Sequence, residues 1–164
     1  MLEIRSVLLI GKAGNGKSTL ANVITGTNEF NESTSTIFGT KKVKYLVFEH
    51  EGIKYRIFDT VGIGDPTRPI EEILSTLGVE ADIISEGLNQ ILFVTRGRFT
   101  REEVEAFKLL KNTIFDEQVV NYTTIICTDF QEFEDDEACE TDRQSFRGKI
   151  ANLSTELAST KIST

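Results

Sequence analysis

The hydrophobic positions of this chain repeat with two different periods. Five apolar runs have the length of strands: 4–10, 43–49, 53–58, 90–95 and 122–128. The second and third runs alternate apolar with polar residues on either side of Glu51 and Gly52, which predicts a β-hairpin. Elsewhere, apolar residues recur three and four positions apart, which predicts helices between the strands. This order predicts an α/β domain with a mostly parallel central sheet, one antiparallel hairpin strand and helices on both faces.

Glycine and polar residues mark the predicted helix boundaries. Gly26 follows the first helical pattern and predicts that this helix ends near Thr25. Thr100 and Glu103 form a Thr-x-x-Glu capping box in front of an apolar stripe over 104–114, which predicts the start of another helix. Two further apolar stripes predict helices over 70–77 and 146–157.

A glycine-rich sequence, GKAGNGKST, joins the first strand to the first helix. It fits the G-x-x-x-x-G-K-[ST] pattern of a phosphate-binding loop. Its glycines let the backbone close around a polyphosphate, so that amide N–H groups and the start of a helix dipole point at negative charge. The Lys17 amine is expected to reach the β- and γ-phosphate oxygens, and the Ser18 hydroxyl to ligate Mg²⁺. The predicted nucleotide-binding residues of this loop are Gly11, Lys12, Ala13, Gly14, Asn15, Gly16, Lys17, Ser18 and Thr19.

Two later segments supply the other groups expected around a γ-phosphate. At the end of the third strand, the Asp59 carboxylate is expected to hold Mg²⁺ through water, and the N–H of Gly62 to sense the γ-phosphate. The polar segment 27–41 lacks a periodic apolar face, as expected of a loop that γ-phosphate and Mg²⁺ put in order. We expect one of its threonines to complete the Mg²⁺ site, and Thr40 is favoured over Thr36.

Composition and charge narrow the class of ligand. The 164 residues, 39% of them hydrophobic, suit one globular domain over 1–164. The net charge of −8 argues against nucleic acid as a partner, because no excess basic charge is available to neutralise a phosphate backbone. There are two cysteines, no signal-peptide pattern and no apolar run long enough to span a bilayer, so we expect a cytoplasmic protein without a membrane segment.

Together these motifs resemble one family of GTPases. The loop at Gly11, the DTVGIGD sequence from Asp59 and the GRFT-x-EE sequence from Gly97 are similar to those of the AIG1-type, or immunity-associated (GIMAP), GTPases in the wider septin and Toc group. The resemblance implies a Ras-like P-loop GTPase fold, binding of GTP and GDP with Mg²⁺, and a nucleotide-dependent homodimer that meets at the nucleotide face. It also implies a catalytic role for Arg98, which matches the arginine that family members are thought to insert into the partner's nucleotide site.

The residue at position 63 also suggests that hydrolysis depends on a second subunit. Many small GTPases place a glutamine after the glycine of this loop to orient the attacking water, and this chain has Ile63. Because isoleucine cannot hold a water, we expect slow hydrolysis by the isolated chain. An arginine supplied in trans would raise the rate of GTP hydrolysis on the order of a thousandfold or more.

The sequence departs from the family at the base-reading end and at the last strand. Where the family often has Thr-Arg-Lys-Asp, this chain has Thr128-Asp129-Phe130-Gln131. We expect Thr128 and Asp129 to face the base, with the Asp129 carboxylate accepting from guanine N1 and N2, although the register leaves guanine and adenine open. Ras-like domains have a sixth strand, and this chain ends about where that strand would begin, so we expect an AIG1-type G domain that is short at its C-terminus.

Two other function classes stay open beside a GTPase that turns over on dimerisation. The first is a GTP- or GDP-gated scaffold that assembles with itself or an unidentified effector and hardly hydrolyses, which Ile63 and the missing strand favour. The second is an ATP-dependent phosphotransferase, which the hairpin before Asp59 and the lack of a separate substrate lid disfavour.

Overall fold

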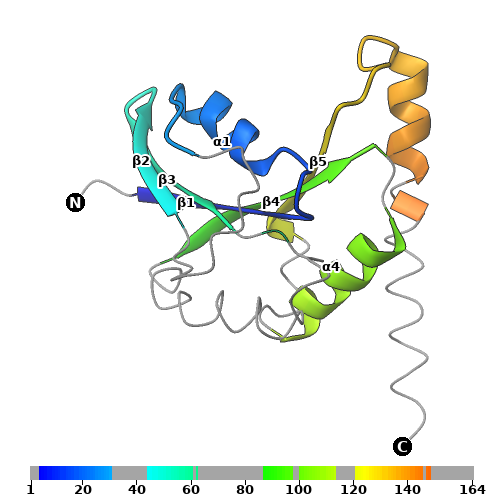
Figure 1. The fold of residues 1–164 in the computed structure, drawn as a ribbon, viewed down its shortest axis with the longest axis horizontal. Helices are drawn as coiled ribbons and strands as arrows, with labels where there is room; N and C mark the ends of the chain where they lie inside the picture. The colour runs from blue at the N-terminus through cyan, green and yellow to red at the C-terminus, as the bar shows by residue number, and fades with distance from the viewer. Residues whose placement is uncertain are drawn as a thin grey trace, which may run out of the picture.

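A five-stranded sheet dominates the computed structural model, which describes residues 4–30, 44–60, 62, 87–97, 100–113, 121–145 and 147–148 (Figure 1). Its strands are β1 (Ile4–Gly11), β2 (Lys44–His50), β3 (Ile53–Asp59), β4 (Leu88–Arg96) and β5 (Thr123–Thr128). Their order across the sheet is β2-β3-β1-β4-β5. The pairs β1–β3, β1–β4 and β4–β5 are parallel, and β2–β3 is antiparallel, which confirms the predicted sheet.

The tight turn between β2 and β3 explains the antiparallel pair. Glu51 and Gly52 both have positive φ, 50° and 75°, as a two-residue type I′ turn requires. The flanking residues His50 and Ile53 pair directly across the two strands. The predicted hairpin and its turn are therefore confirmed.

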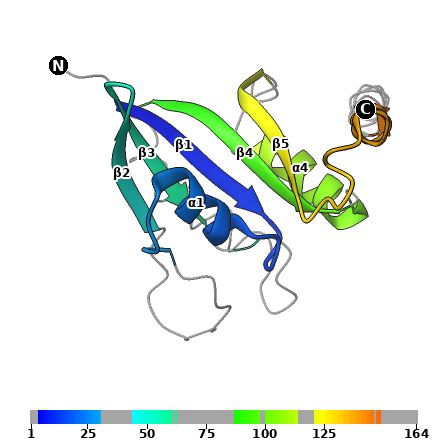
Figure 2. The ribbon, with the colours of Figure 1, turned by 90° about the horizontal axis from the view of Figure 1, so that it is seen from above.

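Among the described residues, helices lie on both faces of the sheet. Helix α1 (Lys17–Thr25) lies on one side and α4 (Arg101–Thr113) on the other, as Figures 1 and 2 show from two directions. On the α1 side the buried cluster consists of Leu9, Ala21, Phe30, Ile57 and Val94. On the α4 side, the rings of Phe93 and Phe107 meet edge to face with centroids 5.6 Å apart. Alternation along β4 thus sends Phe93 and Val94 to opposite faces.

The helix boundaries follow the sequence signals. Gly26 ends α1 with φ of 67°, in the left-handed conformation that glycine favours. At the start of α4, the Thr100 N–H donates to Glu103 Oε2 at 2.8 Å and the Glu103 N–H donates to Thr100 Oγ1 at 3.3 Å. The predicted capping box is therefore present in full.

A further helix over 136–145 follows β5. The Asp135 carboxylate begins it by accepting from the N–H groups of Glu137 and Ala138, at 2.9 and 3.0 Å. The helix predicted over 70–77 lies outside the described residues, as does all but 147–148 of the one predicted over 146–157. In the segments the structure does describe, none of the helices is long and apolar enough to cross a membrane.

Candidate functional site: the phosphate loop and its surroundings

The loop between β1 and α1 lies at the edge of the sheet where the parallel strands end, the usual ligand edge of such sheets. Gly14 and Gly16 have positive φ of 82° and 86°, and Gly16 is the cap residue of α1. The cap makes no side-chain hydrogen bond to α1. The N–H groups of this first turn therefore remain available for an anion, as the sequence predicts.

Lys17 is the buried cation of this loop. The residue is only 6% exposed, and its Nζ donates to the Lys12 carbonyl oxygen at 3.0 Å. Burial lowers the pKa of Lys17 below that of a free lysine, and the Asp59 carboxylate opposes this shift. A bound polyphosphate would give the amine the charge-assisted partner that its burial calls for.

Ser18 and Asp59 come together from positions 41 residues apart. The Ser18 hydroxyl donates to Asp59 Oδ2 at 2.6 Å, which joins the first turn of α1 to the end of β3. A hydroxyl beside a carboxylate suits Mg²⁺, which takes few protein ligands and completes its shell with phosphate oxygens and water. The described segments hold no group of three or more histidine, cysteine or acidic side chains that could bind a metal ion.

Gly62 closes the phosphate loop from the opposite side. A Cβ built on Gly62 would lie 2.3 Å from the backbone N of Ala13 and 2.5 Å from its Cα. Only glycine permits this approach, because no real Cβ comes so close to a backbone atom. Gly62 therefore lies against the loop, and its role as a γ-phosphate sensor stays a prediction.

Asn15 ties the phosphate loop to three other elements. Its Nδ2 donates to the Val94 carbonyl at 3.0 Å and to Glu103 Oε1 at 2.7 Å, and its own carbonyl accepts from the Thr128 hydroxyl at 2.7 Å. Asn15 and Glu103 are 6% and 4% exposed. The sequence signals Glu103 only as a helix cap, and nothing in its spacing from Asn15 indicates the bond between them.

Asn22 is a second anchor that sequence reasoning missed. Its Nδ2 donates to the Phe30 carbonyl at 2.8 Å, and its Oδ1 accepts from the Phe30 N–H at 2.9 Å. Because Phe30 is buried, this paired contact fixes the chain near the start of the polar segment 27–41.

The end of β5 is arranged differently from the phosphate loop. Asp129 has a positive φ of 56°, and its Oδ2 accepts from Nε and Nη2 of Arg96 at 3.0 and 2.8 Å. The Thr128 hydroxyl is directed at the backbone of Asn15 and at the Thr95 carbonyl. Thr128 therefore stands beside the loop, and both predicted base-facing residues already have partners inside the protein.

Four residues with predicted roles lie outside the described residues: Thr36, Thr40, Ile63 and Arg98. Their roles in Mg²⁺ binding, water positioning and catalysis in trans stay predictions. Gly97 and Thr100, on either side of Arg98 and Phe99, are described: the Gly97 N–H donates to the Thr128 carbonyl at 3.3 Å.

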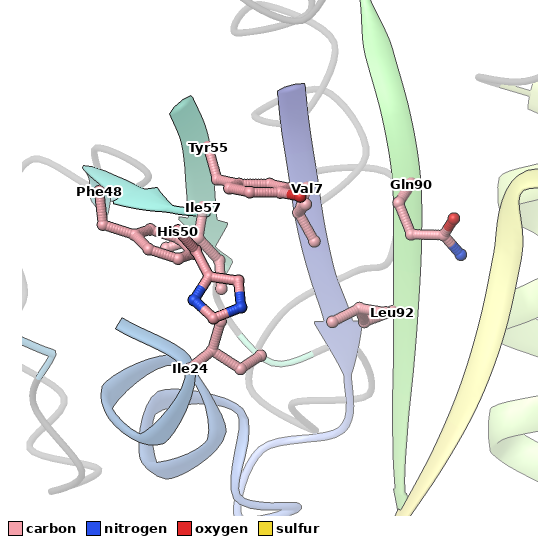
Figure 3. A pocket seen from close by; sticks show the side chains of 8 residues that line it. All are labelled: Val7, Ile24, Phe48, His50, Tyr55, Ile57, Gln90 and Leu92. Carbon is pink, nitrogen blue, oxygen red and sulfur yellow. The ribbon is translucent and has the colours of Figure 1, made fainter. Parts of the chain in front are cut away.

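An apolar pocket of about 350 Å³ lies on the α1 face of the sheet, away from this edge (Figure 3). Its lining comes from β1 to β4 and the last turn of α1: Val7, Ile24, Phe48, His50, Tyr55, Ile57, Gln90 and Leu92. The pocket lacks the glycines, lysine and carboxylate of the phosphate loop, so we assign no nucleotide to it.

Residues 5–152 match the AIG1 family, and the chain belongs to that family. Among curated proteins it is similar to immune-associated nucleotide-binding protein 10 of Arabidopsis thaliana, with 28% identity over 138 residues. The match covers 82% of this chain and 29% of that relative, so the chain spans less than a third of the relative's length.

Among solved structures the fold is similar to that of Toc33 from Arabidopsis thaliana. A dimerisation-deficient mutant of Toc33 superposes with a TM-score of 0.71 at 17% identity, over 93% of this chain and 64% of that one. A complex of Toc33 with Mg²⁺ and GMPPNP gives a TM-score of 0.63 at 18% identity, over 77% and 50%. These likenesses confirm the Ras-like P-loop GTPase fold.

Proposed function

We propose that this chain is a guanine-nucleotide-binding G domain that holds GTP or GDP with Mg²⁺ and hydrolyses GTP. The observation that carries the proposal is the contact between Ser18 and Asp59 beside the buried Lys17. These three residues place a hydroxyl, a carboxylate and a cation around the place where the β- and γ-phosphates would lie. Toc33, which shares the fold, has been crystallised with Mg²⁺ and GMPPNP, and this supports the choice of ligand.

The dependence on a second subunit is the finer part of the proposal. Isolated chains hydrolyse slowly because Ile63 cannot orient a water, and a homodimer supplies Arg98 in trans to stabilise the charge of the transition state. Membership of the AIG1 family supports this, as does the existence of a dimerisation-deficient mutant of Toc33.

A nucleotide panel with turnover measured at several protein concentrations tests both parts. We expect GTP and GDP to bind in preference to ATP when Mg²⁺ is present, and specific activity to rise as protein goes from nanomolar to high micromolar. Equal affinities for GTP and ATP would contradict the choice of ligand. Specific activity that stays flat would contradict catalysis in trans.

Arg98→Ala tests the proposed catalytic arginine, and Arg101→Ala is its matched control. Arg101 lies three residues further on, in the first turn of α4, where its exposed side chain pairs with Glu105. We expect Arg98→Ala to spare GTP binding and to abolish the rise in specific activity, and Arg101→Ala to change neither.

The alternative is an assembly scaffold that GTP and GDP switch without appreciable hydrolysis. The same measurements separate it from a GTPase, because a scaffold would dimerise with GTP while turnover stayed low at every protein concentration. Ile63 is the residue that favours it.

A further inference from the structure

The shape of the phosphate loop depends on a buried contact behind it. The side chain of Asn15 turns away from the edge that would hold phosphate, since Nδ2 donates to Glu103 Oε1 and to the Val94 carbonyl. With both amide hydrogens used inside the protein, this side chain serves as an anchor for the loop. Its two neighbours, Gly14 and Gly16, have no side chains, so among residues 14–16 only Asn15 can hold the backbone in place through a side chain.

The Glu103 carboxylate accepts from two segments at once. Oε2 takes the Thr100 N–H and Oε1 takes the Asn15 amide, and the residue is 4% exposed. The first bond belongs to the start of α4 and the second to the phosphate loop, 88 residues earlier in the chain. The two donors meet different oxygens of the carboxylate, and an amide in its place would present an NH₂ donor to one of them. The loop and the first turn of α4 are thus held as one unit.

We propose that Glu103 is a positioning residue for nucleotide binding: through Asn15 it keeps the phosphate loop in its open, anion-accepting shape before a ligand arrives. Losing this bond makes the nucleotide order the loop as it binds, which lowers affinity. The reverse also holds, because binding and loop order are linked, so a bound nucleotide strengthens the bond between Asn15 and Glu103. This inference rests on the proposed function, since it names a second residue behind the same phosphate site.

The test separates loop positioning from helix capping with three single variants and one double variant. Glu103→Ala removes both bonds, Asn15→Ala removes the bond to Glu103, and Thr100→Ala weakens only the cap while leaving Asn15 and Glu103 paired. We expect Glu103→Ala and Asn15→Ala each to weaken GDP binding about tenfold, the usual scale for removing a supporting contact behind a binding group. The double variant should bind no more weakly than the worse single one.

Thr100→Ala is the matched control. It should lower the thermal midpoint about as much as other cap removals do and yet leave GDP affinity within about twofold. If Thr100→Ala weakens GDP binding as much as Glu103→Ala, or if the effects of Asn15→Ala and Glu103→Ala multiply in the double variant, the inference is wrong.

Hydrogen exchange of the nucleotide-free protein gives a readout that needs no nucleotide. We expect amides of residues 11–18 to exchange faster in Glu103→Ala than in Thr100→Ala, while amides at the start of α4 are affected in both. Equal exchange of the loop amides in the two variants would overturn the inference. A wild-type protein that binds neither GTP nor GDP would instead contradict the proposed function, and the exchange result would still decide the role of Glu103.

Discussion

The two ends of the candidate nucleotide site hold their polar groups in opposite ways. At the phosphate end, Lys17 is 6% exposed, and Ser18 and Asp59 meet at 2.6 Å under the loop. At the end of β5, the Arg96 and Asp129 side chains meet at 2.8 Å but are 60% and 55% exposed. One end is a prearranged, largely buried group of polar side chains, and the other is an ion pair in water.

This difference indicates where binding energy comes from. Buried charge-assisted bonds to phosphate act with little screening, whereas an exposed ion pair contributes about 0–1 kcal/mol and already occupies one of the two Asp129 oxygens. We therefore expect the phosphates to dominate affinity and the base to adjust it. Four changes test this contrast, beginning with the one of largest expected effect.

Removing the Lys17 amine should reduce nucleotide affinity more than any other change. We expect Lys17→Ala to weaken GTP and GDP binding by at least about a hundredfold, because the loop loses its only buried cation among the described residues. Isothermal titration with each nucleotide measures the change. Lys54→Ala, at the amino end of β3 and far from the loop, serves as the control and should bind as the wild type does. A loss below about tenfold for Lys17→Ala would mean that the phosphate end is not dominant.

Adding a side chain at Gly62 should reduce nucleotide affinity by the next largest amount. The Cβ added by Gly62→Ala would lie 2.3 Å from the backbone N of Ala13, so either the segment at 62 or the loop must move. We expect GTP affinity to fall between about tenfold and a hundredfold, the usual loss when a hydrogen bond to a charged group can no longer form. GDP, which lacks the γ-phosphate, should lose less.

Gly148→Ala is the matched control for this glycine. A Cβ built there meets nothing within 4 Å, so binding should not change. Equal losses for GTP and GDP in Gly62→Ala would show that Gly62 shapes the loop without sensing the γ-phosphate.

The protonation of Lys17 should make affinity depend on pH. Burial lowers its pKa in the free protein, and a bound polyphosphate would raise it, so the complex takes up a proton between the two pKa values. Affinity should be flat below the free-protein pKa and should fall as pH rises above it, approaching about tenfold per pH unit within that window. Titrations at successive pH values above neutrality follow the change.

Lys17→Arg controls for ionisation of the nucleotide itself. Its guanidinium keeps its charge throughout the range, so its affinity should change with pH only as much as the nucleotide's own ionisation requires. If the wild type and Lys17→Arg show the same pH profile, Lys17 does not titrate in this window.

The contrast between the two ends also explains how much could be predicted from the sequence. The strand periodicity, the hairpin turn at Glu51 and Gly52, the end of α1 at Gly26 and the capping box at Thr100 are local signals, and all four are confirmed. The phosphate end was also predictable, because a single continuous loop carries most of its chemistry.

Contacts that join distant segments left no such signal. The hydrogen bond from Asn15 to Glu103 depends on how α4 packs behind the loop. The hydrogen bonds between Asn22 and Phe30 depend on the path that the chain takes after α1. The pairing of Asp129 with Arg96 likewise arises because the ends of β4 and β5 are adjacent in the sheet. Residue types at fixed spacing predict local structure, whereas these partners follow from tertiary packing.

The smallest expected effect is at the base end. We expect Asp129→Ala to lower GTP affinity by less than about fivefold, since the carboxylate is exposed to water and already pairs with Arg96, so a bond to the base gains little. The comparison of GTP with ITP, which lacks the guanine N2 amine, isolates the contact: the ratio of their affinities should move toward one in Asp129→Ala. Arg96→Ala should act in the opposite direction and sharpen this ratio, because it leaves the Asp129 carboxylate open to the base. A loss of a hundredfold in Asp129→Ala would mean that the base end, though exposed here, becomes ordered and desolvated around the bound nucleotide, and the two ends would then contribute on the same scale.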